Sequence, residues 1–163
     1  MSADRDLAHR YAELDRAYKA EVLGPEAIDP SGLLVFPYEQ AEAPAEVEIE
    51  TDEFTAVCPW TGLPDWGVIR IRYLPGRTLL ELKSFKYYLL GYRNVGIVQE
   101  HVAGRILADL CGALAPRWME LTLDYKPRGG LHTVVRVSHP NPAGAMEEFT
   151  PRAPSGGRGG GMP

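Results

Sequence analysis

One short segment of the chain places a thiol close to a carboxylate. Cys58 and Asp65 are the first and last residues of 58–65 (CPWTGLPD), and the two prolines and one glycine there predict a structured loop rather than a helix. A thiol held near an acid–base group is what covalent chemistry on an electrophilic carbon requires. The segment also fits a buried cysteine beside a tight turn, with Asp65 capping a backbone amide. Proximity in sequence does not establish a reactive thiol.

A second segment, 81–88 (ELKSFKYY), lies where a predicted strand meets a predicted helix. Lys83, Ser84 and Lys86 near a helix N-terminus predict an anion site, because free backbone amides and cationic side chains converge there. The alternative is a solvated helix face that carries ordinary lysines. The chain has no glycine-rich dinucleotide fingerprint, so the sequence does not predict a Rossmann domain.

Glu100 and His101 lie near the beginning of the longest predicted helix. A carboxylate there can accept two hydrogen bonds from a guanine-like edge, one from a ring N–H and one from an exocyclic amine. An acidic residue in the first turn also interacts favourably with the helix dipole, which is a sufficient reason for its presence. His101 fits either a proton relay or a simple surface position.

Cys111, the second of two cysteines, lies on the same helix between Leu107 and Leu114. It borders the predicted apolar stripe, so we expect a core or interface residue. Neither cysteine has a histidine or cysteine partner at metal-ligand spacing. The four histidines, at positions 9, 101, 132 and 139, include no close pair, and we expect no metal site.

Size and composition fit one compact domain with a real core: 163 residues, of which 45% are hydrophobic and 24% charged. The formal net charge of −5 argues against a general nucleic-acid binder, because phosphate repels an acidic surface. No apolar run approaches the roughly 20 residues that span a bilayer, and the charged first residues do not resemble a signal peptide. Two cysteines predict no disulfide framework. We therefore expect a cytoplasmic protein with reduced thiols.

The chain divides into three regions. Residues 1–44 are predicted to form a helix and an irregular arm, 45–140 the core domain, and 141–163 a C-terminal extension that is disordered from about 151. The first helix is expected over 4–23, and Gly24 follows it. Its apolar residues at helical spacing are Leu7, Tyr11, Leu14 and Tyr18.

Hydrophobic alternation and helical periodicity predict a mixed fold for the core domain. The expected elements are strands over 47–57, 68–74 and 78–82, helices over 83–92 and 97–114, and strands over 118–126 and 131–138. The strand over 78–82 is expected to return from a turn at Pro75 and Gly76, and the last two strands to form a hairpin. This order indicates an α+β fold in which helices cover one face of an antiparallel sheet. Oligomerisation is a simple way to bury the other face and the sheet edges.

Taken together, these segments resemble the single-module NADPH-dependent 7-cyano-7-deazaguanine reductases, over residues 45–140. The family's pattern is Glu, Ser or Leu, Lys, Ser or Ala, a hydrophobic residue, Lys, Leu or Tyr, then an aromatic residue, and 81–88 satisfies every position. Residues 58–65 match the family's cysteine and aspartate in type and spacing. A glutamate follows in the long helix, as the family pattern expects, at Glu100.

The resemblance implies a particular architecture. Residues 45–140 would form a tunnelling-fold (T-fold) catalytic domain, an antiparallel sheet layered by two helices. In this fold, subunits join edge to edge into an oligomeric barrel, and active sites form between neighbours. The family implies a homo-oligomer of two pentameric rings stacked face to face.

The resemblance also implies a reaction, the four-electron reduction of the nitrile of 7-cyano-7-deazaguanine to 7-aminomethyl-7-deazaguanine in queuosine biosynthesis. NADPH would be the co-substrate, and no metal would be required. Cys58 would add to the nitrile carbon to give a thioimide, and Asp65 would supply the proton to nitrogen. The implied substrate-binding residues are Leu80, Glu81, Leu82, Gln99 and Glu100. The implied cofactor-binding residues are Lys83, Ser84 and Lys86, with Arg128 as a secondary candidate.

Two other functions fit parts of the pattern. A T-fold cyclohydrolase or pterin-type enzyme would need zinc ligands, for which the histidines offer no close pair. A non-catalytic purine-binding or oligomeric scaffold would use Glu100 but would have no need of both Cys58 and Asp65. Metal analysis distinguishes the first alternative, and thiol alkylation that the nitrile substrate blocks distinguishes the second.

Overall fold

The computed structural model describes residues 2–40 and 45–140 of the chain. The predicted C-terminal extension, 141–163, including the part expected to be disordered from about 151, lies outside the described residues. The described part forms an α+β fold with antiparallel sheets, which confirms the fold class predicted from the sequence.

Four strands form the main antiparallel sheet of the described residues, in the order β2-β3-β5-β6. They are β2 (Val47–Val57), β3 (Pro64–Leu74), β5 (Trp118–Tyr125) and β6 (Val134–His139). Every second side chain of β3 and β5 is buried, because successive side chains of a strand point to opposite faces. The register places Ile71 opposite Ile49 on one side and Leu121 on the other, so these apolar residues share one face.

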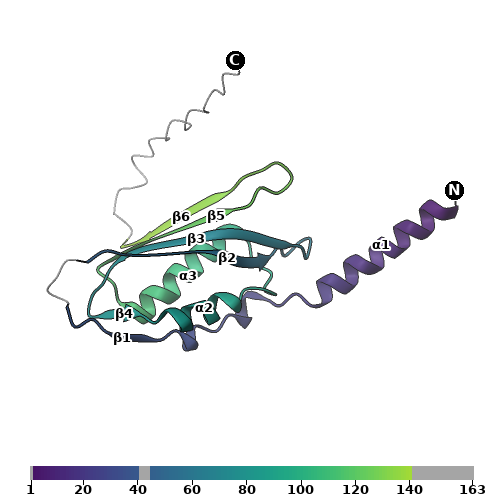
Figure 1. Cartoon of the computed structure of the whole chain (residues 1–163). Helices are drawn as coiled ribbons and strands as arrows, with labels where there is room; N and C mark the ends of the chain where they lie inside the picture. Colours follow the sequence, from purple (N-terminus) through teal and green to yellow (C-terminus); the bar gives the residue numbers. More distant parts are fainter. Residues whose placement is uncertain (1, 41–44, 141–163) are drawn as a thin grey trace, which may run out of the picture.

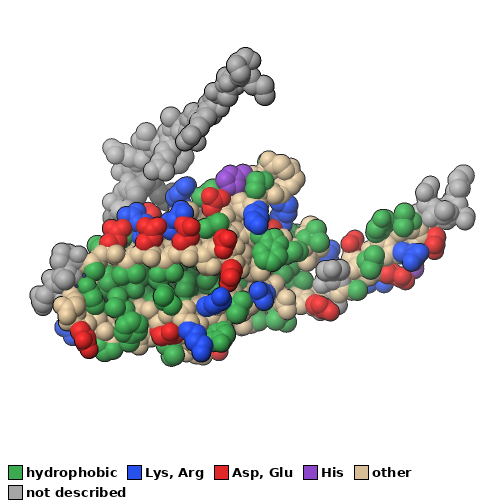
Figure 2. Space-filling model, viewed as in Figure 1, with side chains coloured by type: hydrophobic (Ala, Val, Ile, Leu, Met, Phe, Trp, Pro, Cys, Tyr) green, Lys and Arg blue, Asp and Glu red, His purple; other side chains and the backbone are tan. Residues whose placement is uncertain are grey.

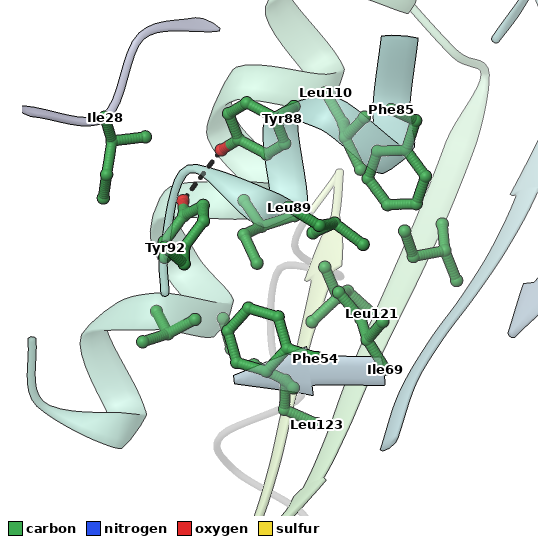
Figure 3. Packing of buried hydrophobic residues seen from close by; sticks show 14 of the residues in the cluster. Ile28, Phe54, Ile69, Phe85, Tyr88, Leu89, Tyr92, Leu110, Leu121 and Leu123 are labelled. Carbon is green, nitrogen blue, oxygen red and sulfur yellow. Dashed lines mark hydrogen bonds between the residues drawn. The ribbon is translucent and has the colours of Figure 1, made fainter. Parts of the chain in front are cut away.

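Two helices, α2 (Leu82–Leu90) and α3 (Gln99–Leu114), cover the apolar face of this sheet (Figure 1). The residues of α3 at 102, 106, 110 and 114 are buried, as their four-residue spacing predicts. Phe54, Leu89 and Tyr92 pack with them between the helices and the sheet (Figure 3). Burial of such a side chain is worth about 1.5–3 kcal/mol, so this layer is the main source of stability.

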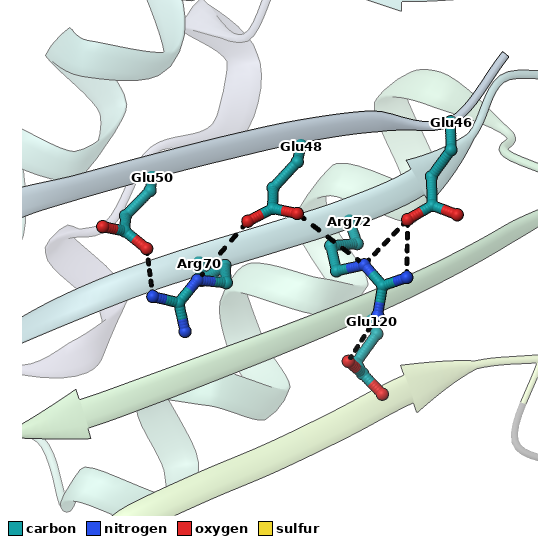
Figure 4. Close-up of polar contacts among 6 residues, drawn as sticks. All are labelled: Glu46, Glu48, Glu50, Arg70, Arg72 and Glu120. Atoms are coloured by element: carbon teal, nitrogen blue, oxygen red, sulfur yellow. Dashed lines mark hydrogen bonds and ion pairs between the residues drawn. The ribbon is translucent and has the colours of Figure 1, made fainter.

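The opposite face of the main sheet carries a row of ion pairs that crosses three strands (Figure 4). Its members are Glu46, Glu48, Glu50, Arg70, Arg72 and Glu120. Figure 2 shows the row of red and blue side chains along the sheet, above a band of apolar side chains. Opposite charges on neighbouring strands favour this register, although each exposed pair contributes only about 0–1 kcal/mol.

A second sheet pairs β1 (Val35–Pro37) with β4 (Thr78–Leu80). The prediction that 78–82 returns along the preceding strand is therefore wrong. Both edges of β3 are already paired, with β2 and with β5, so β4 pairs with a strand from the N-terminal arm instead. The arm is predicted to be irregular because a strand as short as β1 gives no readable alternation.

The N-terminal helix, α1 (Ser2–Ala20), extends away from the layered domain (Figure 1). The helix predicted over 4–23 is confirmed, but it ends at Ala20. Its apolar residues Leu7, Tyr11 and Leu14 are exposed. Two 3-10 helices, Pro25–Ala27 and Pro30–Gly32, connect it to β1.

A partly buried polar network fixes the arm to the two covering helices. Arg105 donates to the Ile28 carbonyl oxygen at 3.1 Å and to Asp109 Oδ2 at 2.7 Å. Asp109 Oδ2 also accepts from the Tyr88 hydroxyl at 2.7 Å, and that hydroxyl shares a 2.8 Å hydrogen bond with Tyr92 (Figure 3). Because each polar group has a partner, the network can be buried without a large desolvation penalty.

Candidate active site

The loop after β2 holds Cys58 in a fixed position. Val57, the last residue of β2, donates its N–H to the Val95 carbonyl at 3.0 Å, which ties the beginning of the loop to the segment before α3. The loop then closes on itself: Cys58 N–H donates to Leu63 O, and Gly62 N–H donates to Cys58 O, both at 2.9 Å. Gly62 has a φ of 74°, in the left-handed region that glycine adopts without a steric penalty.

Asp65 lies on β3 and not in the loop, contrary to the prediction from the sequence. The strand begins at Pro64, and Asp65 pairs with Ala56 of β2. Proline is tolerated at the first residue of a strand, which is why the Pro and Gly around Asp65 do not prevent the extended conformation. The loop therefore joins the end of β2 to the beginning of its partner strand, and this arrangement places Cys58 and Asp65 at the same end of the sheet.

A solvent-open pocket of about 480 Å³ lies at this end of the sheet. Its lining residues are Cys58, Pro59, Trp60, Asp65, Ile97, Val98, Gln99, Glu100 and Arg128. The structure thus brings together both predicted catalytic residues and two of the predicted substrate-binding residues, Gln99 and Glu100. The residues that line the pocket come from the β2–β3 loop, β3, the beginning of α3 and, for Arg128, the β5–β6 connection.

Cys58 is buried, with 3% of its surface exposed, and yet it lines the pocket. Burial raises the pKa of its thiol, because a charged thiolate is poorly solvated there. Hydrogen bonds from Thr61 and from the Trp60 backbone oppose this effect, and Arg128 adds another. Together these donors outweigh burial, so the pKa of Cys58 lies below its ordinary value. A lowered thiol pKa is the property that distinguishes reactive from structural cysteines.

Asp65 is the carboxylate of the pocket, and it is buried as well. Arg128 Nη1 donates to Asp65 Oδ1 at 2.5 Å. Burial raises the pKa of Asp65, and it outweighs the opposing effects of the Arg128 charge and of hydrogen bonds from Gln99 and Arg128. A carboxyl group with a raised pKa retains its proton to higher pH, so it is suited to act as an acid.

Glu100 lies in the first turn of α3 and is exposed at the pocket. Gln99 precedes it, and the Gln99 carbonyl accepts a hydrogen bond from the Tyr125 hydroxyl at 3.3 Å. Burial, followed by the nearby charges of Asp65 and Glu100, raises the pKa of Tyr125, so both carboxylates lie close to this tyrosine. The exposed His101 is not part of the pocket lining.

The second predicted set of residues lies at the beginning of α2, outside the pocket around Cys58. Glu81 caps this helix: its carboxylate accepts from the backbone N–H groups of Lys83, at 3.1 Å, and of Ser84, at 2.7 Å. These hydrogen bonds lower the pKa of Glu81. The Ser84 hydroxyl donates to the Glu81 carbonyl at 2.7 Å and accepts from Leu34 N–H at 3.0 Å. The backbone amides that were expected to bind an anion therefore already have an acceptor.

Lys83 and Lys86 remain exposed on α2. Lys83 lies 5.9 Å from the centre of the Tyr87 ring, and Lys86 pairs with Glu53 of β2 at 3.0 Å. Leu80 is buried and Leu82 is 58% exposed. Leu82 and Lys86 line a largely apolar hollow of about 620 Å³ between β2 and α2, where Figure 2 shows the apolar band. This hollow and the Cys58 pocket share no lining residue.

Among the residues that the structure describes, no group of three or more histidine, cysteine, aspartate or glutamate side chains is arranged to hold a metal ion. Cys111 is half-buried on α3, and burial raises the pKa of its thiol. This is the environment of an inert cysteine, unlike that of Cys58. Across the same part of the chain, no helix combines the length and the apolar character needed to cross a bilayer.

Arg128 is the residue whose position the sequence revealed least. The family resemblance implied a secondary role in cofactor binding, whereas the structure pairs Arg128 with Asp65 in the pocket that Cys58 lines. The sequence shows an arginine directly before two glycines in a connection between two predicted strands, but only the strand order of the structure places this connection at the Cys58 end of the sheet.

A buried thiol of lowered pKa, a carboxyl group of raised pKa and a small pocket define a class of protein, one equipped for nucleophilic thiol chemistry on a small molecule. Comparison with known proteins specifies the family. The model for the QueF-like protein family matches residues 64–144. Together with the relatives described next, this match shows that the chain belongs to the family of NADPH-dependent 7-cyano-7-deazaguanine reductases.

Three curated relatives carry that name. The protein of Caldicellulosiruptor bescii is 51% identical over 115 residues, which cover 71% of this chain and 88% of the relative. The protein of Caldanaerobacter subterraneus subsp. tengcongensis is 51% identical over 113 residues, covering 69% of this chain and 84% of the relative. The protein of Prochlorococcus marinus is 42% identical over 125 residues, covering 77% and 93%.

One solved structure supports the fold. The apo form of the archaeosine synthase QueF-Like aligns with a TM-score of 0.55 and 24% sequence identity. The alignment covers 59% of this chain and 94% of that chain. At this identity the similarity concerns the fold and not the reaction.

Proposed function

We propose that this protein reduces the nitrile of 7-cyano-7-deazaguanine to the primary amine of 7-aminomethyl-7-deazaguanine, with NADPH as the co-substrate, in queuosine biosynthesis. Family membership supports the overall reaction. One observation supports the chemistry: Cys58 and Asp65 line one pocket, where the pKa of the thiol is lowered and that of the carboxyl group is raised. These directions favour a thiolate beside a protonated acid, which is the pair that addition to a nitrile requires.

In the first step, the Cys58 sulfur forms a bond to the nitrile carbon, and one C–N π bond breaks. The nitrogen takes a proton from Asp65, which leaves a neutral thioimide and an Asp65 carboxylate. Nothing is oxidised or reduced in this step. The thioimide accepts hydride more readily than the nitrile, so covalent addition prepares the carbon for reduction.

Recognition of the deazaguanine is assigned to Gln99 and Glu100 at the beginning of α3. The exposed Glu100 carboxylate can accept from the ring N–H and from the exocyclic amine of the pyrimidine edge. The neighbouring Gln99 lines the same pocket as Asp65, so the pyrimidine site adjoins the acid.

When bound, NADPH would supply hydride to the thioimide carbon. The C–S bond would then break to release the Cys58 thiolate and an imine, and a second hydride with one further proton from solvent would complete the amine. Lys83 and Lys86 fit its phosphates, because both ammonium groups are exposed on one helix and neither lies in the Cys58 pocket. Ser84 is 7% exposed and bonded within the chain, so its role in the cofactor site is to fix the beginning of α2 that carries both lysines.

Leu80, Glu81 and Leu82 belong to the proposed substrate pocket through a neighbouring subunit. Within one chain they lie apart from Cys58, and a homo-oligomer provides the means to bring them together. The main sheet has two edge strands, β2 and β6, at which further subunits can pair. We propose a cytoplasmic barrel of two stacked pentameric rings, in which each site combines the Cys58 pocket of one chain with the beginning of α2 of the next.

Intact-protein mass spectrometry with 7-cyano-7-deazaguanine, in the absence of NADPH, tests the proposal. The expected result is an adduct whose mass equals that of the substrate, absent in Cys58→Ala, retained in Cys111→Ala and converted to amine when NADPH is added. A folded protein that binds the nitrile without an adduct would overturn the thioimide. A protein that neither binds the nitrile nor oxidises NADPH in its presence would overturn the proposed function.

A further inference from the structure

Arg128 lies in a tight turn between β5 and β6 that holds its backbone rigidly. Arg128 and Leu131 exchange both backbone hydrogen bonds, at 2.9 and 3.0 Å, around two glycines with φ values of 58° and 80°. Two consecutive left-handed residues are typical of a two-residue hairpin turn, which only residues such as glycine form easily. Lys126 N–H donates to the Trp66 carbonyl at 2.8 Å, so the beginning of the connection is also fixed to β3.

The Arg128 side chain enters the pocket that holds the two reacting groups. Its guanidinium donates to Asp65 Oδ1 at 2.5 Å, and Arg128 lines the same pocket as Cys58. The Arg128 side chain is 47% exposed, whereas that of Asp65 is 5% exposed. The guanidinium charge therefore lies on the solvent side of the Asp65 carboxyl group. A guanidinium remains protonated, so its positive charge favours ionisation of Cys58 as well as of Asp65.

We infer that Arg128 sets the ionisation of the Cys58–Asp65 pair, stabilising the thiolate and determining which of the two residues holds the single proton that the addition step needs. This role rests on the proposed nitrile addition, and it goes beyond cofactor binding, the role that the family resemblance implies for Arg128. The guanidinium takes part in no bond making or breaking. It acts on the reacting atoms through its charge and its hydrogen bonds.

The proton balance shows why such a residue is needed. Before addition, the pair carries one proton, on sulfur or on carboxylate oxygen. Addition consumes the proton from Asp65 while the sulfur bonds to carbon, so the reactive form is the thiolate with the protonated acid. Burial favours the protonated acid, and Arg128 favours both the thiolate and the carboxylate. Arg128 therefore promotes loss of the thiol proton and limits how tightly Asp65 retains it.

Other charged groups face the same loop from several elements. Glu100 of α3 lines the pocket, and Tyr125 of β5 lies close to both carboxylates. Lys19 of α1 lies beside Gly62, near the turn that follows Cys58. Arg128 differs from these groups in that it is a cation that pairs directly with Asp65 and lines the same pocket as Cys58.

The test is the pH dependence of Cys58 alkylation by iodoacetamide in the free protein, followed by peptide mass spectrometry in a Cys111→Ala background. In Arg128→Ala and Arg128→Gln, the midpoint of the alkylation profile should rise by about one pH unit, so alkylation below the midpoint should slow about tenfold. Arg128→Lys keeps the charge and should restore most of the shift. Arg136→Ala, which removes an exposed arginine of β6, is the matched control and should leave the midpoint unchanged.

Repeating Arg128→Ala in an Asp65→Asn background separates the two contacts. The midpoint should rise in this background as well, because the positive charge of Arg128 lies in the pocket that Cys58 lines and stabilises the thiolate without Asp65. A midpoint that does not move in folded Arg128→Ala and Arg128→Gln proteins, or that moves only when Asp65 is present, would overturn the inference. No substrate is used, so these outcomes are independent of the nitrile-adduct experiment, which tests the proposed function.

Discussion

The pocket around Cys58 and the beginning of α2 differ in where their charged groups find partners. In the pocket, the Asp65 carboxyl group is buried although the pocket itself opens to solvent. Its charged partner is Arg128, which is half exposed. At the beginning of α2, the Glu81 carboxylate bonds two backbone amides of its own helix. Burial raises the pKa of Asp65, whereas hydrogen bonds lower that of Glu81.

This difference separates reactivity from stability. A carboxyl group whose folded-state pKa is raised destabilises the fold once it ionises, and such a cost is common at sites that perform chemistry. A carboxylate whose pKa is lowered by helix amides stabilises the fold while it is ionised. One chain thus contains both a prepared acid and a structural cap. Either can affect turnover, but only the cap should contribute to stability at neutral pH.

The largest expected effect is on the acid. Asp65→Asn removes the proton donor, so kcat/KM for nitrile reduction should fall about 10²- to 10⁴-fold. Wild-type activity requires protonated Asp65, so it should decline as pH rises through the raised pKa of that group, and this limb should be missing in Asp65→Asn. Steady-state NADPH oxidation as a function of pH measures both.

Asp124→Asn is the matched control for this prediction, because Asp124 is an exposed residue of β5 that pairs with His132 outside the pocket. It should retain wild-type kinetics. If Asp65→Asn were as active as the wild type, Asp65 would not be the proton donor. The raised pKa of Asp65 would then not distinguish a reactive carboxyl group from the structural one at Glu81.

The second prediction concerns how the two regions meet. If each site combines the Cys58 pocket of one subunit with the α2 residues of another, co-expressed Cys58→Ala and Glu81→Gln chains should form mixed oligomers with activity that neither variant shows alone. Some sites in such oligomers combine an intact Cys58 with an intact Glu81. NADPH oxidation by the purified mixture, compared with each variant, is the measurement.

A mixture of Cys58→Ala and Asp65→Asn chains provides the control for mixing. Both substitutions lie in the same pocket of the same chain, so no combination of these subunits restores an intact pocket with both residues. Recovery in this control, or its absence in the first mixture when both variants are folded, would contradict a site shared between subunits.

Much of this arrangement was predictable from the sequence because it depends on local patterns. The four-residue spacing in α3 and the alternation in β3 and β5 gave the two layers of the domain. The restricted residues around Cys58 gave the loop. In each case, the residues that determine the element are neighbours in the chain, so their pattern can be recognised without knowledge of the fold.

Contacts between distant segments were not predictable in this way. Arg128 reaches Asp65 in the Cys58 pocket because a hairpin turn and a loop lie at the same end of the sheet, and no periodicity in the sequence reveals that contact. The pairing of β4 with β1 depends on both edges of β3 being occupied. The family resemblance implied that Glu81 binds the substrate, and its role as the cap of α2 was not predicted, since glutamate is not among the preferred residues at that position.

The smallest expected effect is on the cap. Glu81→Gln should lower the thermal midpoint at pH 7 by roughly a few degrees, because the neutral amide is a weaker acceptor for the Lys83 and Ser84 amides. The folded-state pKa of Glu81 is lowered, so its stabilisation is present above the unfolded-state pKa and is lost as pH falls through the folded-state value. Thermal unfolding from pH 7 into the acid range should show the two proteins converging.

Glu21→Gln removes the same charge from an exposed position after α1 and should not change the thermal midpoint measurably. A difference between wild type and Glu81→Gln that persisted at low pH could not come from the ionised carboxylate, and Glu81 would then not act as a charged cap. If the midpoint fell as expected while the substrate KM also rose in the assembled enzyme, one carboxylate would serve both helix and ligand. The separation between the structural and the reactive region would then hold within a single chain but not within the oligomer.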